Sequence, residues 1–185
     1  MNSLKKCLKT LATFSTFVTN RKEMSNEVTG LKRVATLCIL RNKHKFLLLK
    51  RLKEPNKDMY VPVGGKLDPF ENPDDAVVRE VMEETGIHIT SKQFCGMLTE
   101  TSPVNYNWIS YVYVSDIEYV EAPYCNEGDL EWISADELES IPTPLTDLYI
   151  YDYVAKGKLF AFNALYDSAL NLTGLWEQYG GTKIK

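Results

Sequence analysis

The most constraining feature of this 185-residue sequence is a short segment that specifies a helix with defined ends. Asn72 is a good N-cap, Pro73 suits the first helical position, and Gly86 suits the left-handed residue that closes a helix. The helix is therefore expected over residues 73–85. One of its stripes is apolar and has to pack against another layer: Val77, Val78, Val81, Met82 and Thr85.

Beside the apolar stripe, Glu80, Glu83 and Glu84 form a second stripe, since residues three and four apart share a helix face. Like charges at this spacing cost a helix about 0.2–0.5 kcal/mol per pair. The cluster therefore needs either full solvation or a cation. One interpretation is a solvated acidic surface. The other is a site for Mg²⁺, with Mn²⁺ as an alternative, because hard carboxylate oxygens select these ions.

Short apolar and β-branched runs around this helix indicate strands. We expect strands at 33–40, 45–51, 60–63, 94–100, 108–117, 130–133 and 159–166, and helices after Ser134 and over 145–156. Strands interspersed with two or three helices predict the α/β class, as a sandwich with a mixed sheet. The final segment holds Leu175 and Trp176, which either dock on the sandwich or bind a partner.

Composition excludes several classes of function. The formal net charge is −4 and the pI about 5.3, so the chain lacks the basic excess needed to hold duplex nucleic acid. No apolar run reaches about 18 residues, so no membrane partner is expected. The four cysteines and two histidines show no zinc-binding spacing, and scattered thiols favour a reducing, cytoplasmic location. Carboxylates therefore have to carry any chemistry.

Residues 1–24 differ in composition from residues 25–185, which are expected to form the domain. This N-terminal extension holds five basic residues and one acidic residue. Its apolar residues fall roughly on one helical stripe, at Leu4, Leu8, Leu11 and Val18. Three interpretations stay open: a disordered tail or sequence upstream of a true start at Met24, a mitochondrial targeting segment if the source is eukaryotic, or a secretory signal.

The acidic helix belongs to a longer pattern with seven fixed identities: Gly65, Glu71, Arg79, Glu80, Glu83, Glu84 and Gly86. At roughly 6–7% use of each residue type, a chance match is on the order of 10⁻⁸ to 10⁻⁹ per starting point. The pattern resembles the Nudix box, whose family hydrolyses nucleoside diphosphates linked to another moiety. The resemblance implies a Nudix-like α/β/α sandwich. The chain is most similar to the MutT-type 8-oxo-dGTP diphosphatase branch, in the runs PVGGKL (62–67) and EGDLEWI (127–133).

The resemblance implies a chemical role for four of the matching residues. Glu80, Glu83 and Glu84 would be catalytic residues that bind divalent metal, with Glu83 and Glu84 as the best ligands. The carbonyl of Gly65 would be a further ligand, since glycine lets the backbone approach a cation closely. Which glutamate acts as the general base stays open.

The remaining matching residues would support the site. Glu71 and Arg79 would form a structural ion pair that fastens the loop to the helix, and Gly86 would end the helix. Glu127, in a later loop, would be a further metal ligand or a catalytic base. Otherwise Glu127 is an ordinary loop acid.

The function implied is Mg²⁺-dependent hydrolysis of a nucleoside triphosphate, such as 8-oxo-dGTP, to a monophosphate and pyrophosphate. Metal ions neutralise the anhydride oxygens, and a carboxylate accepts the proton of the attacking water. One alternative is a Nudix enzyme for ADP-ribose or a dinucleoside polyphosphate, which Pro103 supports weakly. Another is a non-catalytic nucleotide-binding module, which would be expected to lack box carboxylates; here all are present.

No motif outside the box identifies the residues that contact the substrate, so each candidate has two interpretations. Asp147 either accepts hydrogen bonds from a purine edge or is simply an acid at a helix start. Lys50 and Arg51 either attract phosphates or lie on a solvated edge strand. Three aromatic residues offer stacking surfaces or belong to the core: Tyr106, Trp108 and Tyr149. The oligomeric state is left as monomer or homodimer.

Overall fold

The computed structural model describes residues 29–185, so the interpretations of residues 1–24 lie outside the described residues. The strands are β1 (Arg33–Asn42), β2 (Lys45–Arg51), β3 (Tyr60–Val61), β4 (Gln93–Thr101), β5 (Trp108–Asp116), β6 (Gly128–Ser134), β7 (Phe160–Tyr166), β8 (Leu172–Glu177) and β9 (Thr182–Lys183). The helices are α2 (Pro73–Thr85), the 3-10 helix η1 (Ala135–Ser140) and α3 (Leu145–Ala155).

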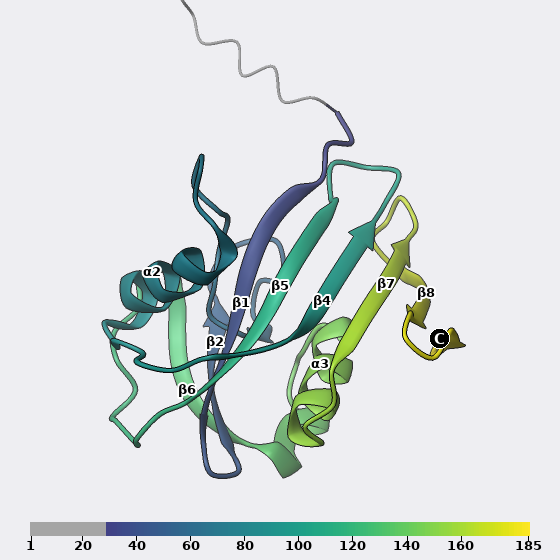
Figure 1. The fold of residues 1–185 in the computed structure, drawn as a ribbon. Helices are drawn as coiled ribbons and strands as arrows, with labels where there is room; N and C mark the ends of the chain where they lie inside the picture. The colour runs from purple at the N-terminus through teal and green to yellow at the C-terminus, as the bar shows by residue number, and fades with distance from the viewer. Residues whose placement is uncertain (1–28) are drawn as a thin grey trace, which may run out of the picture.

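The strands of residues 29–185 form one mixed sheet, as the sequence predicts. Its order is β3-β2-β1-β5-β4-β7-β8-β9, and β6 pairs with β2. β5 is parallel to β1 and β7 is parallel to β4, whereas the other pairs are antiparallel. Helix α2 lies on one side of the sheet, near β1, and α3 lies on the other (Figure 1). In the described part of the chain, no helix is long and apolar enough to cross a membrane.

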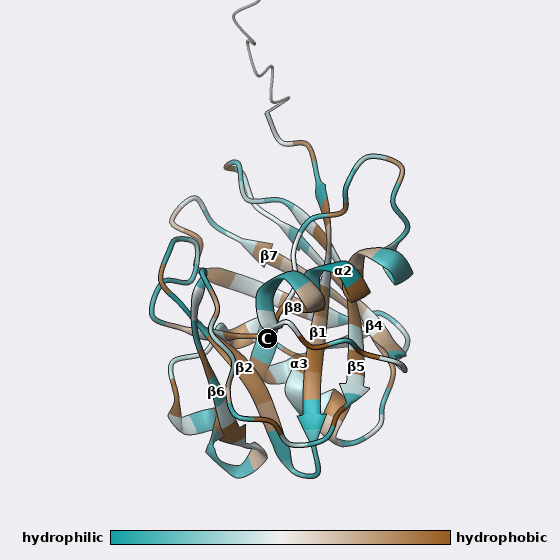
Figure 2. Cartoon of the chain, turned by 90° about the vertical axis from the view of Figure 1, so that its left-hand side faces the viewer, coloured by the Kyte–Doolittle hydropathy of each residue, from teal (hydrophilic) through white to brown (hydrophobic). Residues whose placement is uncertain are grey.

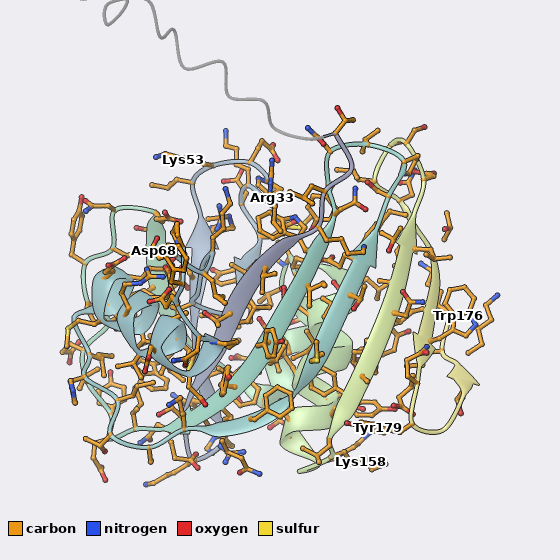
Figure 3. All side chains as sticks on the ribbon, turned by 45° about the horizontal axis from the view of Figure 1, so that its top comes forward. Arg33, Lys53, Asp68, Lys158, Trp176 and Tyr179 are labelled. Atoms are coloured by element: carbon orange, nitrogen blue, oxygen red, sulfur yellow. The ribbon has the colours of Figure 1, made fainter. Side chains whose placement is uncertain are left out.

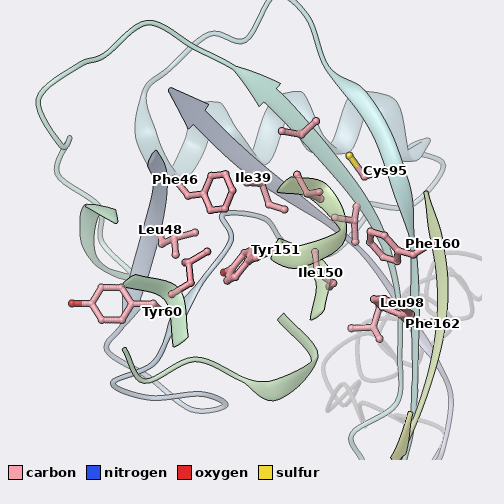
Figure 4. Close-up of a cluster of buried hydrophobic side chains, with 14 of the residues drawn as sticks. Ile39, Phe46, Leu48, Tyr60, Cys95, Leu98, Ile150, Tyr151, Phe160 and Phe162 are labelled. Carbon is pink, nitrogen blue, oxygen red and sulfur yellow. The ribbon is translucent and has the colours of Figure 1, made fainter. Parts of the chain in front are cut away.

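Each helix closes a separate apolar core, which explains the layering. On the α3 side, Ile150, Tyr151 and Val154 pack against β1, β2, β4, β5 and β7 (Figure 4). On the α2 side, Val77 and Val81 pack against β1, β2 and the segment after β3. Hydrophobic residues accordingly concentrate on the central strands, while hydrophilic residues cover much of α2 (Figure 2).

The ends of α2 are those that the sequence predicts. The Asn72 side chain accepts a hydrogen bond from the Asp75 amide at 3.0 Å, which caps the first turn. Gly86 has a φ of 70°, and its amide donates to the Met82 carbonyl at 2.8 Å. A left-handed residue costs glycine little, so the helix ends there and the chain turns back towards the sheet.

The glycine turn after β3 runs beside β1 and is held there by backbone hydrogen bonds. After β3 the chain crosses to β1, where the Cys38 amide donates to the Val63 carbonyl and the Thr36 amide to the Gly65 carbonyl, both at 2.8 Å. A Cβ atom on Gly64 would lie 2.1 Å from the Thr36 carbonyl oxygen. Only glycine therefore lets the turn pass this close to β1.

The last residues form two strands that the sequence pattern did not predict. Strand β8 pairs with β7, and Leu175 is fully buried in the core on the α3 side. Docking on the sandwich is therefore confirmed for Leu175, whereas Trp176 is only partly buried. The helix after Ser134 is present but is of the 3-10 type, with the Ser134 amide donating to the Glu137 carboxylate at 3.2 Å.

Replacement of Leu175 by alanine should show that β8 is part of the core. Leu175→Ala is expected to lower the free energy of unfolding by about 2–5 kcal/mol, because a buried leucine leaves a cavity. Leu165 of β7 is 37% exposed and serves as the control, with an expected change below about 1 kcal/mol for Leu165→Ala. Urea denaturation followed by circular dichroism measures both. Equal small losses would contradict the docking of β8.

Candidate active site

One cavity of about 590 Å³ joins two groups of polar side chains. At one end lie the glycine turn, the acidic helix and the β2 and β6 ends: Gly64, Gly65, Glu80, Glu84, Arg51 and Glu127. At the other end lie residues of β4, β5, their connecting loop and the start of α3: Leu98, Glu100, Tyr106, Trp108, Thr146 and Asp147. Figure 3 shows Arg33 and Asp68, which line the cavity, far from Trp176 of β8.

A second hollow of about 620 Å³ lies at the N-terminus of α2, beside Phe94, Tyr111 and Tyr113. None of the sequence-predicted catalytic residues is among the residues that line it. Its volume therefore does not make it the better candidate, because volume without convergent polar groups carries no chemistry.

Glu84 is the most deeply placed carboxylate of α2. Its Oε2 accepts a hydrogen bond from the Gly64 amide at 2.9 Å, so the glycine turn and the helix are directly joined. Burial raises the pKa of Glu84 to about 7, and repulsion by Glu127 and Glu80 acts in the same direction. A cation placed among these groups would offset both effects.

Glu80 faces the second glycine of the turn. A Cβ atom on Gly65 would lie 2.5 Å from the Glu80 carboxylate, so glycine makes room for this side chain. Burial raises the pKa of Glu80, against the hydrogen bond from Arg79. The Gly65 carbonyl already accepts the Thr36 amide, which leaves its second lone pair for another partner.

Arg79 ties the loop before α2 to the helix. Its Nε and Nη2 donate to the two oxygens of Glu71, both at 2.8 Å. These bonds hold the pKa of Glu71 at about 2. Nη1 of Arg79 donates to Glu80 at 2.8 Å and to Glu83 at 3.2 Å. Glu83 is therefore turned towards Arg79, and it is not among the residues that line the cavity.

The donor set suits a hard divalent cation, although the side chains are not gathered around one point. Among residues 29–185, no three acidic, histidine or cysteine side chains form a ready ligand group. Glu80, Glu84 and Glu127 nevertheless line one cavity and repel one another, and all their donor atoms are oxygens. Glu83 would have to leave Arg79 to join them. The residues present therefore fit a magnesium-type ion in chemistry.

Glu127 and Arg51 lie where the loop before β6 meets the end of β2. The Arg51 guanidinium is 3.7 Å from the Glu127 carboxylate, which is 52% exposed. The Leu52 amide donates to the Glu127 carbonyl at 3.0 Å and fixes the loop. Lys50 is not among the residues that line the cavity; its ammonium lies 5.7 Å from the centre of the Tyr60 ring. Of the two basic residues proposed from the sequence, Arg51 faces the cavity.

The other end of the cavity contains two buried carboxyl groups. Asp147 lies in the first turn of α3, and burial raises its pKa to about 8, with the charge of Glu100 as a further cause. Glu100 comes from β4 and accepts hydrogen bonds from the hydroxyls of Tyr166 at 2.8 Å and Tyr106 at 3.3 Å. Sequence reasoning missed Glu100, although a charged residue within an apolar strand was an available signal.

The three aromatic residues considered from the sequence lie in two different places in the structure. Tyr106 and Trp108 line the cavity, whereas Tyr149 packs against the core on the α3 side. The Trp108 ring has the guanidinium of Arg33 at 5.4 Å and the ammonium of Lys66 at 5.8 Å from its centre. Sequence reasoning named neither cation, because nothing local marks a residue as the neighbour of a distant ring.

The acidic helix is thus joined to the glycine turn beside a cavity of about 590 Å³, a volume that suits a small-molecule ligand. The sequence matches the NUDIX domain family over residues 31–154, and the chain therefore belongs to the Nudix hydrolase family. Members of this family act on nucleotide-like substrates and generally use divalent metals.

Individual relatives agree with this family. The uncharacterized Nudix hydrolase YvcI from Bacillus subtilis (strain 168) is 32% identical over 137 residues, which are 71% of this chain and 84% of that protein. The structure resembles that of a MutT protein from Bacillus halodurans, with a TM-score of 0.71 and 24% identity over 80% of this chain and 98% of the other. It also resembles the NUDIX domain of Shewanella oneidensis NrtR complexed with ADP ribose: TM-score 0.61, 14% identity, 77% and 97% coverage. These two likenesses show the fold alone.

The buried Asp147 carboxyl makes a prediction about stability. Its pKa is about 8 when folded against an ordinary 3.8, so only the folded protein keeps this proton between those values. Stability is therefore lost as the pH rises from about 4 towards 8. Asp147→Asn should remove this loss. The unfolding free energy of the wild type relative to the variant should fall with pH by at most about 1.4 kcal/mol per unit.

Urea denaturation from pH 5 to about 8.5 provides the measurement. Asp152→Asn, at the surface of the same helix, is the matched control and should follow the wild type. A pH-independent difference between the wild type and Asp147→Asn would show that Asp147 is not held neutral by burial.

Proposed function

We propose that the protein hydrolyses a purine nucleoside triphosphate of the 8-oxo-dGTP kind to the monophosphate and pyrophosphate, and so clears damaged nucleotides. The observation that supports this is the cavity itself, which has Glu80 and Glu84 of the box at one end and aromatic and buried carboxyl groups at the other. A nucleotide has the same two parts, a polyphosphate and a base. A non-catalytic module is disfavoured because Glu80, Glu83 and Glu84 are all present.

The proposed cofactor is Mg²⁺, with Mn²⁺ as a substitute. Bound at Glu80, Glu83, Glu84 and the Gly65 carbonyl, with Glu127 as a further candidate, it would neutralise phosphate oxygens and lower the pKa of a bound water. The ligand assignments rest on the family resemblance and, for Gly65, Glu80, Glu84 and Glu127, on their position in the lining of the cavity; Glu83 would join them after leaving Arg79.

The protein's own residues would divide the remaining work. Arg51 faces the cavity and would attract phosphate oxygens, which also frees Glu127 from its ion pair at 3.7 Å. Glu127, half exposed at the cavity edge, would then accept the proton of the attacking water. Trp108 and Tyr106 would stack on the base, and Asp147 would bond to its edge. Lys50 lacks such support because it is not among the cavity-lining residues.

A substrate panel tests the proposal. Purified protein with Mg²⁺ is incubated with 8-oxo-dGTP, the four common deoxynucleoside triphosphates, ADP-ribose and a dinucleoside polyphosphate, and the products are separated by chromatography. Preferred turnover of 8-oxo-dGTP, with release of pyrophosphate, is expected. Exclusive turnover of ADP-ribose or of the dinucleoside polyphosphate would replace this substrate by the alternative one.

Glu83 should control turnover without supporting the fold. Glu83→Gln is expected to lower kcat by several orders of magnitude, because it removes a charged ligand while keeping the shape. Glu83 is 59% exposed, so the melting temperature should stay within a few degrees. Glu139→Gln, at an exposed position of η1, is the control and should keep full activity. Near-normal kcat in Glu83→Gln would reject the assignment.

The space left by Gly65 should matter for activity more than for stability. In Gly65→Ala the new methyl group would meet the Glu80 carboxylate, a flexible side-chain end that can turn away. Displacement of a catalytic group by about 1 Å can cost about 100-fold, and we expect a loss of that order in kcat. Gly180→Ala, in the turn after β8, is the control. Equal kcat values for the two variants would contradict the role of Gly65.

A further inference from the structure

Glu100 is a buried carboxylate that the proposed reaction does not use. It lies on β4, lines the cavity at the end opposite to the acidic helix, and is only 6% exposed. A carboxylate in such a place costs free energy unless its oxygens have partners. Its position therefore calls for an explanation beyond that of a surface charge.

The surroundings of Glu100 hold it as a hydrogen-bond acceptor. The hydroxyls of Tyr166 and Tyr106 both donate to the same oxygen, Oε1, at 2.8 and 3.3 Å. Lys32 donates to the Glu100 carbonyl at 2.8 Å, and its positive charge favours the ionised carboxylate. Burial raises the pKa of Glu100, and the hydrogen bonds from Tyr166 and Tyr106 and the charge of Lys32 lower it only in part. The second oxygen, Oε2, can then accept a bond from a ligand.

Asp147 provides the complementary group at the same end of the cavity. Burial raises the pKa of Asp147 to about 8, and the negative charge of Glu100 acts in the same direction, which favours the protonated carboxyl near neutral pH. A protonated carboxyl donates a hydrogen bond, whereas an ionised one only accepts. An acceptor, Glu100, and a donor, Asp147, thus line the same cavity.

We propose that Glu100 selects the base, accepting hydrogen bonds from ring and amino N–H groups of a guanine-type edge while Asp147 donates to the neighbouring carbonyl oxygen. This inference rests on the proposed function, since it assigns the base within the same cavity. A guanine edge offers N1–H and 2-amino donors beside the O6 acceptor, and 8-oxoguanine keeps all three. Adenine offers an acceptor at N1 and no donor at C2, so it leaves the carboxylate without a partner.

The test is calorimetric titration of the protein with dGMP and dAMP, which needs no turnover. The wild type is expected to bind dGMP about 10-fold or more tightly than dAMP. Glu100→Gln keeps the shape but replaces an acceptor oxygen by a donor, so this preference should fall by about 10-fold or more. A preference that is unchanged, or a fall in both affinities by the same factor, would overturn the proposal, because a structural role would affect both ligands alike.

Glu177→Gln is the matched control, because Glu177 is also a buried glutamate and its carboxylate accepts hydrogen bonds from the amides of Tyr179 and Gly180. Glu177 is not among the residues that line the cavity, so the preference for dGMP should stay as in the wild type.

A test on the ligand covers the case in which Glu100→Gln does not fold. The wild type is titrated with dIMP, which lacks the 2-amino group, and with N1-methyl-dGMP, which lacks N1–H. At least one of them should bind about 10-fold more weakly than dGMP, and equal binding of all three would overturn the proposal. If no triphosphate is hydrolysed but the dGMP preference depends on Glu100, the proposed function fails while the base assignment stands.

Discussion

The close passage of the glycine turn between β1 and α2 is the constraint on which the rest of the site depends. Gly64 approaches the Thr36 carbonyl so closely that no side chain fits, and its amide reaches Glu84 at 2.9 Å. Gly65 leaves the space that the Glu80 carboxylate fills. The backbone of the glycine turn thus contacts β1 on one side and carboxylate side chains of α2 on the other, which fixes Glu80 and Glu84 at the cavity.

Electrostatic balance at the acidic helix comes from one arginine. Arg79 holds Glu71 with two hydrogen bonds and contacts Glu80 and Glu83 with its remaining nitrogen. In this arrangement Glu83 is kept away from the cavity, whereas Glu84 stays inside it. A cation that binds Glu83 would have to replace its hydrogen bond from Arg79. Until then, the positive charge of Arg79 offsets the negative charges of Glu80 and Glu83.

Both ends of the cavity carry carboxyl groups, but the surroundings of these groups differ. At the α2 end, the carboxylates repel one another and suit a cation. At the α3 end, burial raises the pKa of Asp147 and favours its neutral form. Glu100 accepts hydrogen bonds from the hydroxyls of two tyrosines. Groups of the same type therefore differ in their protonation because their surroundings differ.

The sequence by itself determined what depends on neighbours along the chain. The ends of α2 follow from Asn72 and Gly86, and most strands follow from local apolar runs, so these predictions agree with the structure. The acidic pattern indicated the family for the same reason. Tertiary structure decided what depends on contacts between distant segments: the burial of β8, the choice of Arg51 over Lys50 at the cavity, and the meeting of Glu100 with Asp147. Whether a side chain faces a cavity or solvent depends on strand pairing and packing, and no local sequence signal encodes either.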